Sequence, residues 1–126
     1  MDTDQGKNIV LLGDKPLAAE FHRQSFFKVL LCDANFEQVR IPSGFLLHAQ
    51  VTEEPFGVRT LTGPSGHKWK VKLSIEGKNI YIKDGWQRFY RENSLIDYDF
   101  LVFRQCGNFN FDVQIFDKRG VEKTNR

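Results

Sequence analysis

The sequence has few of the residues that mark secreted or metal-binding proteins. It carries only two cysteines, Cys32 and Cys106, which are too few for the disulfide framework of a small secreted domain. Its three histidines, at positions 22, 48 and 67, show no spacing with these cysteines that suits a structural zinc site. We therefore expect reduced thiols in a reducing compartment, with no metal and no other cofactor.

Long apolar runs are also missing. No run approaches the roughly 20 residues that a membrane span requires. The first eight residues are polar, and the apolar run at 9–12 is too short for the core of a secretory signal. The sequence therefore predicts no membrane association and no secretion.

The usual motifs of enzymes are absent as well. No glycine-rich phosphate loop follows an expected strand, and no serine lies in a strand-turn-helix elbow. The carboxylates are scattered, and none lies in an apolar run where burial would raise its pKa. We expect a non-catalytic protein without a small-molecule substrate.

The sequence does contain ample material for one hydrophobic core. Hydrophobic residues make up 40% of the 126 residues, and twelve of them are phenylalanines. Residues 1–20 are polar and acidic without clear periodicity. We expect a flexible leader over 1–22, one domain over 23–119 and a frayed basic tail over 120–126.

The hydrophobic pattern predicts a mostly β protein. Expected strands cover 25–31, 38–41, 58–62, 68–75, 79–83, 100–103 and 109–115. Short helices are expected over 42–49 and over 84–93, the second with Asp84 as its N-cap. Short strands joined by tight turns indicate an antiparallel sheet that is curled into a barrel or packed as a sandwich.

One strand carries the clearest functional pattern. Lys68, Lys70 and Lys72 alternate with apolar residues, so they share one face of the strand. Lysines two residues apart lie roughly 7 Å from one another, which is close to the phosphate spacing along a DNA strand. The stretch 68–91 holds seven basic and two acidic side chains. This face suits a polyanion, although a solvated surface rich in lysine would have the same pattern.

The turn after this strand suggests a second kind of contact. Lys78 and Asn79 stand at the tip of the expected hairpin, and a hairpin can enter the major groove of DNA. There Asn reads adenine, and Lys reaches guanine or phosphate. The alternative is that these residues only form the turn. The periodicity of Trp69 and Trp86 assigns both to the core rather than to base stacking.

Six motifs in order resemble the plant-specific B3 DNA-binding domain, and most closely its reproductive-meristem subfamily, which includes vernalization-type regulators. The resemblance runs from about Phe26 to Lys123. Its motifs are Phe26-Phe27-Lys28, Arg40-Ile41-Pro42 with Phe45, Gly66-His67-Lys68-Trp69-Lys70-Val71, Asp84-Gly85-Trp86 with Phe89, Asp99-Phe100-Leu101-Val102-Phe103, and Phe111 to Asp117.

The resemblance implies a seven-stranded open (pseudo) β-barrel with two short α-helices. It also implies that two arms grip the major groove of double-stranded DNA in the nucleus. The first arm would be Cys32–Glu37 and the second the turn at Glu76–Asn79. The residues predicted to bind DNA are Lys28, Asp33, Asn35, Arg40, Lys68, Lys70, Lys72, Ser74, Lys78, Asn79 and Tyr81.

The sequence departs from the sequence-specific members of this family at three places. The first arm contains Asp33 and Glu37 but no Lys or Arg, and the second carries Glu76 and lacks the family's Trp-Asn pair. Tyr98 stands where the family usually has a glycine. We therefore expect phosphate-led DNA binding with weak base readout by a transcription regulator. The alternative is a module that binds a protein partner, or a second copy of itself, with little affinity for DNA.

Overall fold

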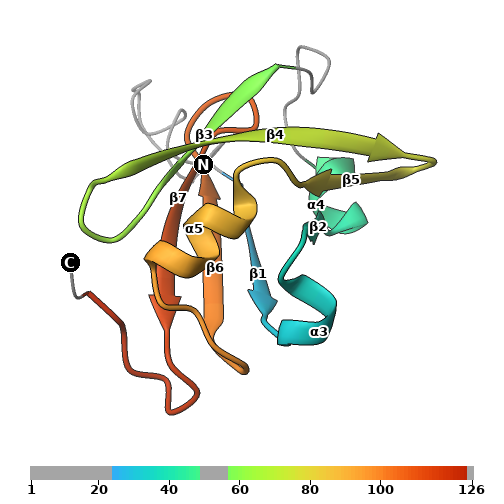
Figure 1. The fold of residues 1–126 in the computed structure, drawn as a ribbon. Coiled ribbons are helices and arrows are strands. Elements are labelled where there is room, and N and C mark those ends of the chain that lie inside the picture. The colour runs from blue at the N-terminus through green and yellow to red at the C-terminus, as the bar shows by residue number, and fades with distance from the viewer. Residues whose placement is uncertain (1–23, 49–56, 125–126) are drawn as a thin grey trace, which may run out of the picture.

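A computed structural model describes residues 24–48 and 57–124, so the leader expected over 1–22 lies outside the described residues. Within these described residues the chain forms seven strands and three short helices (Figure 1). The strands are β1 (Ser25–Val29), β2 (Val39–Ile41), β3 (Val58–Thr62), β4 (Lys68–Glu76), β5 (Asn79–Ile82), β6 (Phe100–Gln105) and β7 (Phe111–Phe116). The helices are α3 (Cys32–Asn35), α4 (Ser43–His48) and α5 (Trp86–Glu92).

The strands form one sheet in the order β1-β6-β7-β3-β4-β5-β2. All neighbours pair antiparallel except β3 and β7, which run parallel. No pairing joins β1 to β2 within the described ranges, so the barrel stays open at this seam. The predicted mostly β, seven-stranded open barrel is confirmed.

The barrel interior is filled by the apolar residues that alternate along the strands. In β7, for example, Phe111, Val113 and Ile115 are buried while the residues between them are not. Helix α5 closes the core with three buried aromatics, Trp86, Phe89 and Tyr90, as its helical spacing predicted. The Trp69 ring of β4 meets Phe89 edge-on at 5.0 Å, so α5 is packed against β4. No helix among residues 24–48 and 57–124 is long and apolar enough to cross a membrane.

Helix α5 does not begin as expected. Asp84 was predicted as its N-cap, but the cap position is held by Gly85, with φ of 89° and no side-chain cap bond. A Cβ atom at this position would collide with the carbonyl oxygen of Lys70. Glycine is required here because it alone allows both the left-handed backbone and the close approach to β4.

Helix α3 was not predicted; it lies between β1 and β2, within the first arm Cys32–Glu37. The four residues of α3 are held by two side chains: Asn35 Oδ1 accepts the Leu31 N–H at 2.8 Å, and Asp97 Oδ1 accepts the Cys32 N–H at 2.6 Å. These bonds satisfy backbone donors at the helix start that would otherwise lack partners. Two helices were predicted, and the described residues contain three.

The end of the domain also differs from expectation. Phe109 was predicted within the last strand, but it precedes β7 with φ of 63° and is nevertheless buried. The tail was expected to fray from residue 120, yet Lys123 donates its backbone N–H to the Ile115 carbonyl at 2.7 Å. The Lys123 ammonium lies 2.8 Å from the Asp99 carboxylate, whose side chain is only 1% exposed. A buried charge partner thus holds this part of the tail on the barrel.

Candidate nucleic-acid interface

The lysine face predicted for β4 is confirmed at its first three positions. Lys68, Lys70 and Lys72 are exposed, whereas Trp69 and Val71 are buried. The alternation weakens toward the end of the strand, where Ile75 is 45% exposed. The hairpin of β4 and β5 extends beyond the barrel there (Figure 1), so an inward side chain has no core to enter.

The sheet register brings several predicted residues onto the same outer face. Tyr81 of β5 pairs with Arg40 of β2 on one side and with Ser74 of β4 on the other. Directly paired residues point to the same face of a sheet, and Ser74 shares its face with Lys72. Residues from three strands therefore form one polar surface with two flanking cations.

Lys83 adds a cation that the sequence reasoning did not select. Its backbone N–H donates to the Lys72 carbonyl at 2.9 Å, so the two lysines are neighbours across the hairpin. Its ammonium lies 3.4 Å from the Glu76 carboxylate, which also accepts the Ser74 hydroxyl at 3.2 Å. The sequence contained the information needed to select Lys83, because residues two apart in a strand lie on the same face and Lys83 follows Tyr81 by two.

The tip of the second arm is a tight turn. Gly77 adopts a φ of 64°, which lets two residues join the strands. Lys78 is exposed at this tip, and Asn79 is half-buried opposite Glu76. Both therefore project with the hairpin, as predicted, and both also form the turn.

The first arm is built around α3. Asp33 is exposed on it, but the Asn35 side chain already accepts a backbone N–H. The Asn35 carbonyl accepts the Trp86 indole N–H at 2.7 Å, which fixes the arm to α5. Asn35 was predicted to contact DNA, but both its side chain and its carbonyl already accept hydrogen bonds that hold the first arm in place.

A cleft of about 490 Å³ separates the two arms, and its charge is mostly negative. Asp33 and Glu37 line it from the first arm, and Glu76 and Lys83 line it from the second. The remaining lining residues are Cys32, Ala34, Phe36 and Gln38. Its lining includes none of the lysines selected from the sequence, so these lysines must meet a polyanion from the outer faces of the arms.

Two cations lie close together at the open seam of the barrel. Burial lowers the pKa of the Lys28 ammonium, and the nearby Arg40 guanidinium lowers that pKa further. Within the described part of the chain, neither side chain has an acidic partner. An anion at the seam would relieve this repulsion, so the pair is suited to a phosphate.

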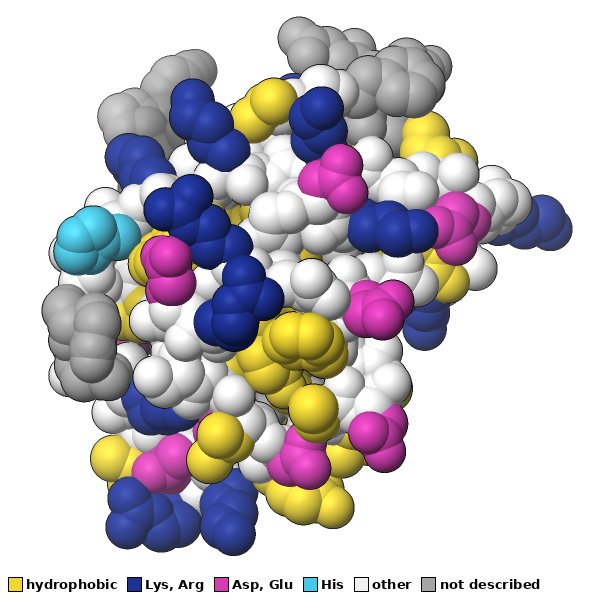
Figure 2. Space-filling model, viewed as in Figure 1, with side chains coloured by type: hydrophobic (Ala, Val, Ile, Leu, Met, Phe, Trp, Pro, Cys, Tyr) yellow, Lys and Arg dark blue, Asp and Glu magenta, His cyan; other side chains and the backbone are white. Residues whose placement is uncertain are grey.

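A second hollow, of about 370 Å³ and mostly basic, lies between β4 and α5. Its lining consists of His67, Lys68, Trp69, Lys70, Arg88 and Glu92. Glu92 accepts the Trp69 indole N–H at 2.8 Å and the Arg88 guanidinium N–H at 3.0 Å. Both bonds lower the Glu92 pKa, the Trp69 bond most, so this carboxylate stays charged and partly offsets the cations. In Figure 2, Lys and Arg side chains gather on the part of the surface that β4 crosses.

Among the described residues, no group of three or more His, Cys, Asp or Glu side chains could hold a metal ion. The geometry is that of two projecting arms beside surfaces rich in exposed lysine and arginine side chains, which suits electrostatic attraction of a polyanion.

Comparison with known proteins agrees with this geometry. The model of the B3 DNA binding domain matches residues 26–119. The rice B3 domain-containing protein Os11g0197600 is 34% identical over 100 residues, covering 79% of this chain and 24% of the relative. Arabidopsis thaliana REM23 is 37% identical over 106 residues, with 82% and 34% covered. Arabidopsis thaliana VRN1 is 33% identical over 94 residues, with 73% and 27% covered.

Solved structures show the same fold. The Arabidopsis thaliana protein At1g16640.1 superposes with a TM-score of 0.65 at 26% identity, covering 75% of this chain and 91% of that protein. The protein in the Arabidopsis FUS3–DNA complex superposes with a TM-score of 0.53 at 18% identity, covering 71% and 93%. The chain spans only 24% to 34% of the length of the three curated relatives above. The chain belongs to the B3 DNA-binding domain family, with relatives in the reproductive-meristem and VRN1-like branch of plant B3 proteins.

Proposed function

We propose that this chain is a non-catalytic module that binds double-stranded DNA within a nuclear plant transcription regulator. Its two arms enter the major groove, and phosphate contacts supply most of the affinity. The observation that carries the proposal is the set of exposed cations on β2, β4 and the hairpin tip. Arg40, Lys70, Lys72 and Lys78 have no acidic partner among the described residues, so they are available to phosphates.

The acidic cleft supports binding that is led by phosphates rather than by bases. Asp33, Glu37 and Glu76 repel phosphates, so the DNA backbone must follow the outer cations. A carboxylate in the major groove accepts a hydrogen bond from the cytosine N4 amino group. The carboxylates of this cleft can therefore recognise few bases, and the preference of the protein for particular DNA sequences should be weak.

The fold relatives support the same proposal. FUS3 was solved in a complex with DNA, and the barrel of this chain superposes on that protein. The matching family model describes a DNA-binding domain. Lysine and arginine contacts to phosphates release counterions, which makes such binding strongly dependent on salt.

Fluorescence anisotropy of labelled random-sequence duplexes tests the proposal across a salt series. Four phosphate contacts predict that log K falls against log salt with a slope of about −3.6. A sharp consensus should not emerge when binding sites are selected from random duplexes. Absence of binding at about 50 mM salt, or binding without a salt slope, rejects the proposal.

A second candidate function is a protein-interaction module with little affinity for DNA. The acidic cleft between the arms favours it, because a polyanion is repelled where the arms face each other. Isothermal titration with duplex DNA, together with the solution mass of the free domain, separates the two functions. Micromolar binding of DNA by the monomer contradicts this second candidate.

A further inference from the structure

The outer face of β1, β6 and β7 differs in character from the lysine face of β4. Val29, Phe100 and Phe116 form one row across the three strands. Phe27 pairs with Val102 in the next row. Phe27 is 58% exposed, and its ring stacks on that of Phe100 with the ring centroids 4.9 Å apart. An outer sheet face that carries five apolar side chains is expected to have an occupant.

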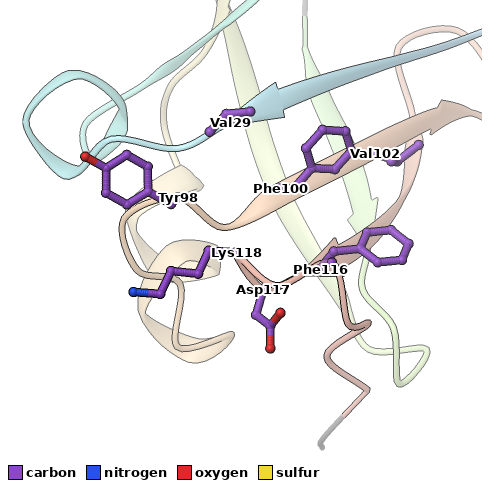
Figure 3. Close-up of a pocket in the computed structure, with 8 residues that line it drawn as sticks. Val29, Tyr98, Phe100, Val102, Phe116, Asp117 and Lys118 are labelled. Atoms are coloured by element: carbon purple, nitrogen blue, oxygen red, sulfur yellow. The ribbon is translucent and has the colours of Figure 1, made fainter.

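Four of these side chains, all except Phe27, line a groove with a cavity volume of about 700 Å³ (Figure 3). Val29, Tyr98, Phe100, Val102 and Phe116 provide its apolar lining. At its rim, Asp117 is neutralised by Arg119 at 2.8 Å and accepts backbone N–H groups as well. Lys118 also lines the groove and is in none of the ion pairs among the described residues, so the rim is left with a positive charge.

The size of the patch indicates a short segment rather than a second copy of the chain. Phe27 and Tyr98 are 58% and 56% exposed. An aromatic side chain offers 150–250 Å², so these two present roughly 200 Å². Val29, which is 46% exposed, and the less exposed Phe100, Val102 and Phe116 bring the patch to on the order of 350 Å². A stable protein dimer buries about 800 Å² on each partner. The groove volume, in contrast, lies in the range that accommodates a few apolar side chains.

We propose that the groove binds the apolar run Ile9–Leu12 of this same chain. Residues 1–23 lie outside the described part of the structure, and their sequence matches the groove in two respects. Four consecutive apolar residues suit the apolar floor. The surrounding segment 1–20 has two basic and four acidic residues, including Asp14 close to the run, which complements Lys118 at the rim.

The length of the connection permits this contact. The described chain starts at Gln24, directly before β1, whose outer face forms one wall of the groove. Residues 13–24 can span up to about 40 Å, and β1 itself is roughly 13 Å from Ser25 to Val29. Because the segment is tethered, its effective concentration is on the order of millimolar, so weak contacts suffice.

Amide NMR spectra of the full chain test this proposal. Leu11→Asp places a charge in the run, so the amide signals of Val29, Phe100, Val102 and Phe116 should shift while those of β4 and β5 stay unchanged. Lys7→Gln is the matched control and should leave the groove signals unshifted. The fluorescence of a dye that binds apolar surface should also rise in Leu11→Asp, because the groove is uncovered.

A second variant changes the groove itself rather than the apolar run Ile9–Leu12. In Val102→Asp, the further change Leu11→Asp should produce no additional shift at the groove, provided that the spectrum remains that of a folded barrel. If the groove amides are identical in the wild type and Leu11→Asp, the proposal is overturned. Groove shifts that disappear on dilution would assign the face to a second copy of the chain and would also overturn it.

Discussion

Replacing Lys70 and Lys72 together with glutamine should halve the salt dependence of DNA binding. Both side chains are exposed on the outer face of β4, so their removal leaves the buried residues Trp69 and Val71 in place. Each phosphate contact contributes about 0.9 to the slope of log K against log salt, so the slope should change from about −3.6 to about −1.8. Between 50 and 200 mM salt, the wild-type affinity should fall about 150-fold and that of the variant about 12-fold.

Fluorescence anisotropy with several unrelated duplexes measures both slopes. The loss should be similar for every sequence, because phosphates carry no sequence information. Lys118→Gln is the matched control, since it removes one exposed lysine beside the apolar groove and should leave the slope unchanged. Urea unfolding should change by no more than about 0.5 kcal/mol in either protein. An unaltered slope in the double variant would refute the assignment of these lysines to phosphates.

Three further predictions concern the seam, the tail and one strained residue. Burial and Arg40 lower the pKa of Lys28 in the free protein, and a bound phosphate raises this pKa in the complex. DNA affinity should therefore fall as the pH rises from the Lys28 pKa of the free protein to that of the complex. Lys28→Gln should remove this pH dependence in an anisotropy series. Lys123→Ala leaves the buried Asp99 carboxylate without its cation and should reduce the free energy of unfolding in urea by about 3 kcal/mol; a loss under 1 kcal/mol would contradict the tail attachment. Tyr98 has a φ of 71°, so Tyr98→Gly should stabilise the domain by about 0.5–1 kcal/mol in the same assay, whereas destabilisation would show that the ring's contacts outweigh its backbone strain.

The strands and the helix α5 could be predicted because their patterns are local. Side chains alternate along a strand by covalent geometry, so the buried Trp69 and the exposed Lys70 follow from their order alone. The spacing of Trp86, Phe89 and Tyr90 likewise predicted a helix with one buried face. Helix α3 escaped prediction because the carboxylate that holds its first turn belongs to Asp97, 65 residues from Cys32.

Some features of the candidate site could likewise be predicted from local sequence, and others depend on the fold. That Lys68, Lys70 and Lys72 share an exposed face is decided by the period of a strand, and residue order alone is enough for that. That Lys28 lies close to Arg40, and that acidic residues of both arms line one cleft, is decided by the barrel. Strand order and closure bring together side chains that are remote in the chain. Their charges therefore interact only once the sheet has curled into a barrel, and this interaction cannot be predicted from the local sequence pattern.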